Sequence, residues 1–209
     1  MTSAFQAAAS EIGAEVNADD DVQANAVASS CAYARPDRCG NMGRIESGGN
    51  LRTGFKWVAY RDISGEGPLR VALAGTDDLA DAVADGSQAL GLSTAQYKAA
   101  QRVARSLKAS YGDNIVFVGH SLGGGLAAAA ARATALSAMT FNAAGLSKRY
   151  GGGASGPGSI TAYSSRTDAL SLFQDALPGV WNAAGTRRFV RGGGLHGIAG
   201  MCSALGADC

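Results

Sequence analysis

Charged side chains, long apolar runs and histidines are all scarce in this sequence of 209 residues. Charged residues make up 17% of the chain, against about a quarter in an average protein, while 46% of the residues are apolar, which excludes a disordered chain. The chain has eighteen basic and seventeen acidic residues, so its net charge is +1. It therefore lacks the excess of basic residues that is typical of proteins that bind nucleic acid. We therefore expect a globular protein that does not bind nucleic acid.

No segment is suited to crossing a membrane or to directing export through a Sec signal. The longest apolar stretch, residues 126–139, is interrupted by Arg132 and falls short of the roughly 20 residues that a spanning helix needs. Residues 1–16 include Glu11 and Glu15 but no lysine or arginine, so they lack the basic start of a secretory signal. We expect a protein that is cytoplasmic in its producer before export, and is then secreted or delivered to a periplasm without such a signal on this chain.

Four cysteines form two couples that are close in the sequence, Cys31 with Cys39 and Cys202 with Cys209. Local pairing would close two short loops as disulfides in an oxidising compartment. Four cysteines nevertheless allow three pairings, and a cytosolic protein would keep them as free thiols. Their spacing is wider than that of zinc ligands, and both histidines have a stronger claim elsewhere, so a zinc site fits poorly.

The chain changes character near residue 54, which divides it into two predicted parts. Residues 1–53 are polar and irregular, with an acidic run and several turn formers, and are expected to form a helical and loop appendage. In residues 54–209, the expected strands are 55–60, 69–74, 115–118, 139–143 and 159–163, and the expected helices are 93–111 and 122–137. Strands that alternate with helices predict an α/β catalytic domain with a mainly parallel sheet flanked by helices.

The segment Gly119-His120-Ser121-Leu122-Gly123 lies between a predicted strand and an alanine-rich helix. This G-x-S-x-G pattern is typical of a nucleophile elbow, a sharp and strained turn that raises a serine above the sheet of an α/β-hydrolase. A dinucleotide-binding loop is excluded, because Ser121 replaces a glycine of its fingerprint. His120 is set aside as a base, because its side chain is expected to leave the backbone on the side opposite to Ser121. Ser121 is therefore the predicted nucleophile of an α/β-hydrolase fold.

An acid and then a histidine are expected after the serine in the chain order of an α/β-hydrolase. After Ser121 there is one histidine, His196, which lies in a glycine-rich segment and is the predicted base. Asp208 follows His196 and fails the order. Of Asp168 and Asp175, we favour Asp168, because it comes soon after a predicted strand, where the sites of α/β proteins lie.

Two backbone amides are candidates to stabilise the negative charge that develops on a carbonyl oxygen. The Leu122 N–H lies at the start of a helix, where unpaired amides point outward. The Thr76 N–H, in the turn Leu73–Asp77 after an earlier strand, could complete the oxyanion hole. The same turn could instead be a simple helix cap, because Gly-Thr-Asp suits both roles.

Five segments together resemble the class 3 lipases, in particular bacterial phospholipase-like members. They are Ala72–Asp77, Gln88–Leu90, Gln96–Tyr97, Gly119–Gly124 and Thr140–Leu146. The resemblance runs from about residue 54 to residue 200 and implies a triad of Ser121, Asp168 and His196, with Thr76 helping to bind the oxyanion. Similar bacterial domains include antibacterial effectors, which implies specialised secretion and an immunity or inhibitor protein as a partner.

These observations predict a serine hydrolase that cleaves carboxyl esters of lipids or phospholipids through an acyl-enzyme, as a lipase or phospholipase A. This serine chemistry requires neither a metal nor an organic cofactor. A soluble short-chain esterase is an alternative, because substrate choice depends on loop shape. A catalytically inactive hydrolase-like binding module is another. Residues 138–209 hold six basic and three acidic residues, and this net charge of +3 could attract a membrane surface, although a solvated face without a partner fits equally well.

Overall fold

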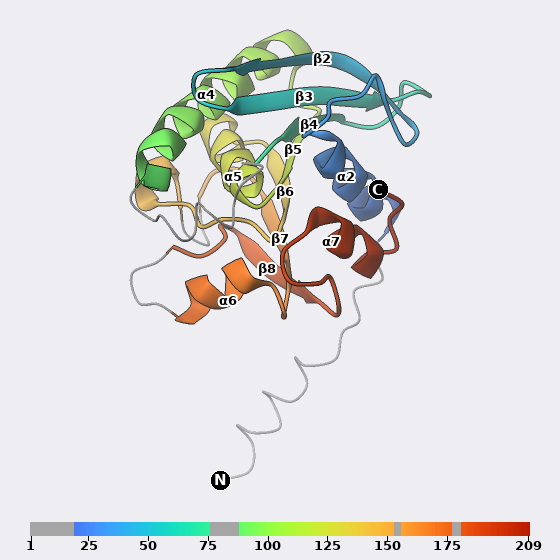
Figure 1. Ribbon diagram of the computed structural model, residues 1–209. Coiled ribbons are helices and arrows are strands. Elements are labelled where there is room, and N and C mark those ends of the chain that lie inside the picture. Colours follow the sequence, from blue (N-terminus) through green and yellow to red (C-terminus); the bar gives the residue numbers. More distant parts are fainter. Residues whose placement is uncertain (1–18, 76–87, 153–155, 177–180) are drawn as a thin grey trace.

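The described residues build one sheet with helices on both of its faces (Figure 1). The computed structural model describes residues 19–75, 88–152, 156–176 and 181–209. The strands are β1 (Arg38–Cys39), β2 (Met42–Asn50), β3 (Phe55–Asp62), β4 (Leu69–Leu73), β5 (Ile115–His120), β6 (Ser137–Phe141), β7 (Ile160–Ser165) and β8 (Thr186–Val190). The helices are α2 (Asp20–Cys31), α4 (Gln88–Tyr111), α5 (Leu122–Thr134), the 3₁₀ turn η1 (Lys148–Tyr150), α6 (Ala169–Ala176) and α7 (Ile198–Ala204).

The strands follow one another across the sheet in the order β1 to β8. Strands β1 to β4 pair antiparallel, whereas β4 to β8 run parallel to one another. The predicted α/β fold with a mainly parallel sheet is therefore confirmed. Because parallel strands end at one edge of a sheet, the loops that follow β5, β7 and β8 lie at the same edge.

Apolar layers on the two faces of the sheet hold the helices in place. Helices α4 and α5 cover one face, where Leu126 packs with Leu73 and Phe117 in the largest buried cluster. Helices α2 and α7 cover the other face, and Val118 and Met201 are fully buried there (Figure 1). Burial on both faces explains why β5 reads as a continuous apolar run. None of the described helices is long and apolar enough to cross a membrane.

The sheet begins earlier in the chain than the apolar pattern indicated. Strand β2 pairs with β3 from Met42 to Asn50, inside the residues that were expected to form an appendage. Most of its side chains are exposed, so β2 lacks the alternation of a half-buried strand. Gly48 packs against Trp57 of β3, and a Cβ at this position would lie 2.8 Å from the indole nitrogen. The predicted boundary at residue 53 thus falls in the turn between two paired strands.

Helix α5 ends three residues before the predicted end at residue 137. Ala135 takes a left-handed backbone, with φ 58° and ψ 25°, which stops the helix. Ser137 already belongs to β6, where it pairs with Val116 of β5. Alanine-rich sequence continues across this point, so composition alone does not mark where the helix ends.

Candidate active site

Ser121 lies at the turn between β5 and α5, where the backbone is strained. It has φ 58° and ψ −129°, a conformation that non-glycine residues keep only where the surrounding structure enforces it. A Cβ on Gly119 would lie 2.3 Å from the carbonyl oxygen of Gly123, and a Cβ on Gly123 would lie 2.1 Å from that of Leu73. Only glycine fits at these two positions. The turn therefore has the geometry of a nucleophile elbow.

The backbone of Ser121 is held from both sides while its hydroxyl has no partner. Its N–H donates to the Phe141 carbonyl at 3.1 Å, and its carbonyl accepts from the Ala144 N–H at 2.9 Å. The residue is 2% exposed, yet its Oγ makes no hydrogen bond with a described residue. The Leu122 N–H at the start of α5 likewise donates to no residue in the described part of the chain. Among the described residues, this hydroxyl and this amide therefore have no competing partner.

Asp168 and His196 meet at the edge of the sheet where β7 and β8 end. Asp168 is fully buried, and its Oδ1 lies 2.6 Å from Nδ1 of His196. Its Oδ2 accepts from the Ser171 N–H at 2.7 Å, so the carboxylate also caps α6. Because a carboxylate can only accept, Nδ1 of His196 carries a proton and donates it to this contact. In a neutral imidazole this leaves Nε2 as the nitrogen that can accept a proton. The predicted acid and base are therefore in contact.

His196 Nε2 is buried and, like Ser121 Oγ, has no partner among the described residues. The two atoms do not form a hydrogen bond with each other. Such contacts are often open in proteins without a bound substrate and close in the reactive complex. The arrangement offers a candidate nucleophile, Ser121, a candidate base, His196, and a candidate acid, Asp168. The hydrogen bond between Ser121 and His196 is absent.

The other predicted candidates have different surroundings. Asp175 forms an ion pair with Arg187, with Oδ1 2.7 Å from Nη1, so its carboxylate is engaged away from His196. Asp208 is exposed near the end of the chain. Thr76, the predicted second oxyanion donor, lies outside the described residues. Within the described ranges, no group of three or more histidines, cysteines and carboxylates could hold a metal ion.

His120 contacts His196, which the sequence did not suggest. The two ring centroids lie 4.9 Å apart, and His120 Nε2 lies 2.6 Å from the backbone oxygen of His196. His120 Nδ1 lies 3.2 Å from the hydroxyl of Tyr33. Burial is the main cause that lowers the pKa of His120 to about 4, so the ring is neutral at neutral pH. These partners are far from His120 in the sequence and left no local signal there.

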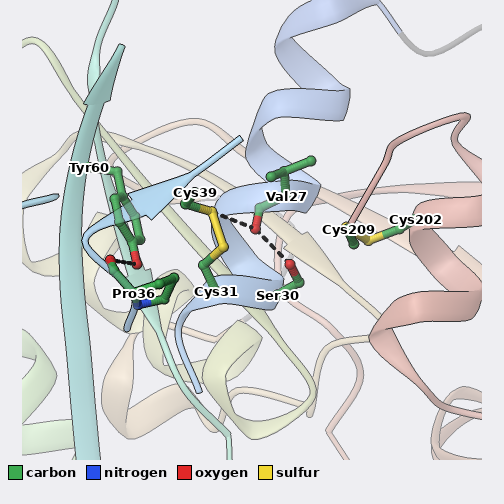
Figure 2. The surroundings of a disulfide bond; sticks show 8 residues. All are labelled: Val27, Ser30, Cys31, Pro36, Cys39, Tyr60, Cys202 and Cys209. Carbon is green, nitrogen blue, oxygen red and sulfur yellow. Dashed lines mark hydrogen bonds between the residues drawn. A yellow bond between two sulfur atoms is a disulfide. The ribbon is translucent and has the colours of Figure 1, made fainter. Parts of the chain in front are cut away.

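Disulfides join both couples of cysteines (Figure 2). Cys31 at the end of α2 is bonded to Cys39 in β1, and Cys202 in α7 is bonded to Cys209. The Tyr60 hydroxyl, from β3, donates to the Pro36 carbonyl at 2.9 Å in the loop that the first disulfide closes (Figure 2). The segment after α2, which includes Tyr33, is thus tied to the sheet.

Comparison with protein families and sequences gives two matches. The family model described as Phospholipase-like, Tle-like phospholipase domain, matches residues 43–208. An extracellular phospholipase A1 of Serratia liquefaciens is 53% identical over 77 residues, which are 37% of this chain. This match covers 24% of the Serratia protein, so the matched part of the chain spans about a quarter of the length of that relative.

Two solved structures with a similar fold are fungal lipases. A triacylglycerol lipase of Penicillium expansum superposes with a TM-score of 0.63 at 18% identity, covering 93% of this chain and 91% of that protein. A lipase of Rhizopus microsporus var. chinensis gives a TM-score of 0.61 at 16% identity, covering 81% and 73%. At this level of identity the likeness concerns the fold, and it confirms the predicted α/β-hydrolase architecture.

Proposed function

Because the chain belongs to the family of Tle-like phospholipase domains, we propose that it is a serine carboxylic ester hydrolase that cleaves an acyl ester bond of a phospholipid. The observation that carries the proposal is the 2.6 Å contact between His196 and the buried Asp168, at the edge of the sheet where the strained Ser121 turn also lies. A serine, a histidine and an acid in this relation form the machinery of acyl transfer.

In the first half of the reaction, Ser121 Oγ attacks the carbonyl carbon of the ester while His196 Nε2 accepts its proton. Asp168 accepts the hydrogen bond from Nδ1–H, which keeps the imidazole in the tautomer that leaves Nε2 unprotonated. It also stabilises the imidazolium that forms. Substrate binding is expected to close the contact between Ser121 and His196, which is open in the structure described above.

Loss of the alcohol completes the first half of the reaction, and hydrolysis of the acyl-enzyme then returns the enzyme to its starting state. Negative charge on the former carbonyl oxygen is stabilised by the Leu122 N–H at the start of α5 and, in our prediction, by the Thr76 N–H. His196 gives its proton to the departing lysophospholipid alkoxide, which leaves an acyl group on Ser121. The same imidazole then takes a proton from water, whose oxygen attacks the acyl carbon. The bond between the acyl carbon and Ser121 Oγ breaks, and His196 gives this proton to Oγ, which releases a fatty acid and restores the free serine.

Exposed apolar side chains beside the acid and the base support contact with a lipid surface. Leu195 is 76% exposed and precedes His196 in the chain. Its carbonyl accepts from the first N–H of α6, and this helix also exposes Leu172 and Phe173. Exposed apolar side chains of this kind can insert into the apolar part of a lipid surface. The net charge of +3 over residues 138–209 favours contact with anionic headgroups.

The disulfides and the Serratia relative support a site of action outside the cytoplasm. Disulfides persist in oxidising compartments, and that relative is described as extracellular. Delivery as an antibacterial effector, with an immunity protein to protect the producer, stays a prediction from the family resemblance.

A fluorophosphonate probe tests the central claim, because it labels only an activated serine. We expect labelling of the wild-type protein at Ser121 and none in Ser121→Ala. With phospholipid vesicles, Ser121→Ala and His196→Ala should each lower turnover by roughly 10⁶, and Asp168→Asn by roughly 10⁴, because the amide favours the wrong imidazole tautomer.

Asp175→Asn is the matched control, because it removes the same charge from an aspartate that pairs with Arg187. Its turnover should stay within about threefold of the wild type, since exposed ion pairs contribute little. A folded protein that the probe does not label would instead be an inactive binding module. Hydrolysis of short soluble esters without hydrolysis of vesicles would identify a short-chain esterase.

A further inference from the structure

The buried ring of His120 bridges two segments that are distant in the sequence. His120 is 5% exposed and lies at the end of β5, directly before Ser121. One ring nitrogen, Nε2, contacts the backbone oxygen of His196, and the other, Nδ1, contacts the Tyr33 hydroxyl. The ring therefore connects the segment after α2 to the loop that carries the proposed base.

Both contacts have a defined direction. A carbonyl oxygen can only accept, so the contact at His196 requires the proton on His120 Nε2. A neutral imidazole has one N–H, which makes Nδ1 an acceptor, and the Tyr33 hydroxyl must donate to it. Burial lowers the pKa of His120 to about 4 and so keeps the ring neutral. The His196 carbonyl thus fixes the tautomer of His120, and the Tyr33 hydroxyl satisfies the ring nitrogen that is left unprotonated.

The loop 192–197 needs such support because four of its six residues are glycines. Its carbonyls at residues 192, 194 and 195 accept hydrogen bonds from Ser165 Oγ, Thr167 Oγ1 and the Ala169 N–H. These donors all lie between the last residue of β7 and the first residue of α6, the stretch that contains Asp168. Among the described donors to residues 192–196, only His120 comes from the elbow side. His120 therefore ties the backbone of His196 to the strand that presents the nucleophile.

We propose that His120 and Tyr33 are positioning residues that hold the His196 backbone, and with it the imidazole, in register with Ser121. The proposal rests on the catalytic role that we assign to His196. Without the donor at His120 Nε2, the glycine-rich loop keeps its contacts to the Asp168 side but loses its tether to the elbow. A displacement of about 1 Å at a reacting group can lower turnover about 10²-fold.

Tyr33 is well placed to act as the fixed end of this chain of hydrogen bonds. It follows Cys31 by two residues, and the Cys31–Cys39 disulfide joins this segment to β1 (Figure 2). Its hydroxyl also packs on the backbone of Gly75, where an added Cβ would lie 3.0 Å away. The segment after α2 thereby reaches the edge of the sheet at which β4 and β5 end.

Paired substitutions at His120 test the hydrogen bond separately from the packing. His120→Met fills similar space without an N–H donor, and we expect kcat for phospholipid hydrolysis to fall about 10- to 100-fold with KM changed less than about threefold. His120→Gln carries an amide N–H at the place of Nε2 and should restore at least half of this loss on a logarithmic scale. Equal defects in both variants would overturn the proposal.

Tyr33→Phe and Tyr60→Phe form a second pair. Each removes one hydroxyl donor, from Tyr33 in the turn after α2 or from Tyr60 in β3, but only the Tyr33 hydroxyl reaches His120. We expect Tyr33→Phe to lower kcat about 5-fold, the effect of one net hydrogen bond, and Tyr60→Phe to leave kcat within about twofold of the wild type. Equal kcat values for the two variants would overturn the role of Tyr33.

A spectroscopic readout separates positioning from loss of folded protein. The Nδ1–H proton of His196, bonded to Asp168, should give a downfield proton NMR signal that is absent in Asp168→Asn. We expect this signal to shift or broaden in His120→Met and to be restored in His120→Gln at the same fraction of folded protein. An unchanged signal and unchanged kcat in His120→Met would refute the proposal, whereas full activity of Ser121→Ala would instead refute the proposed function.

Discussion

Mild acid should destabilise the folded protein through His120. The ring is buried beside His196 and Tyr33, with Asp168 as the nearby carboxylate, and burial is the largest cause that lowers its pKa from 6.5 to about 4. In the unfolded chain the ring regains its ordinary pKa. Between the two values the unfolded chain binds one more proton than the folded protein, so the free energy of unfolding rises with pH in this window. The free energy of unfolding therefore decreases as the pH drops from 6.5 toward 4.

The size of the effect follows from the two pKa values. One pKa unit corresponds to about 1.36 kcal/mol, so the full window contributes about 3 kcal/mol to the free energy of unfolding. Between pH 7 and pH 5 the loss is about 2 kcal/mol, because the unfolded ring is then mostly charged while the folded ring is still mostly neutral. This is a large share of the roughly 5 to 15 kcal/mol that stabilises a typical domain.

The matched variant is His120→Gln, which keeps an amide donor at the same place but does not titrate. Equilibrium urea unfolding, followed by the fluorescence of Trp57 and Trp181, should be measured for both proteins at pH 7 and pH 5. We expect the wild type to lose about 2 kcal/mol more than the variant on acidification, since all other titrating groups are shared and cancel. Equal losses in the two proteins would show that His120 is not held neutral by burial.

Three further predictions concern the elbow, the disulfides and the lipid surface. Gly123→Ala should lower the free energy of unfolding by about 3 kcal/mol, because the Cβ would lie 2.1 Å from a strand carbonyl oxygen, and an unchanged thermal midpoint would contradict this. Replacing Cys31 and Cys39 by alanine should lower the free energy of unfolding, measured in urea, by about 2 to 3 kcal/mol. Alkylation of natively prepared protein without reductant should add no mass. Four added alkyl groups would disprove both disulfides. Leu195→Ser should slow the hydrolysis of anionic vesicles about tenfold but leave the hydrolysis of a soluble short ester unchanged. The control Ile63→Ser, which changes an exposed side chain at the opposite edge of the sheet, should affect neither reaction. Equal rates of vesicle hydrolysis for the two variants would argue against contact between Leu195 and the lipid surface.

The elbow could be predicted because its cause is local. Glycines two residues on either side of Ser121 are required by contacts within one strand–turn–helix unit, so the five-residue pattern carries the information. Strand and helix alternation likewise predicted the α/β architecture, and the elbow pattern added the α/β-hydrolase fold. The resemblance to bacterial phospholipase-like lipases is confirmed by the family match. Strand β2 escaped prediction, because it is mostly exposed and is held by pairing with β3.

The sequence by itself determined the tight turn at Ser121, the family and the small set of residues from which an acid and a base could come. Only the tertiary structure decided that Asp168 contacts His196 while Asp175 pairs with Arg187, since both aspartates fit the chain order. The tertiary structure also decided that His120 reaches the backbone of His196, 76 residues away. Such contacts depend on where the ends of separate strands meet, and hydrogen bonds between distant segments leave no periodic pattern along the chain.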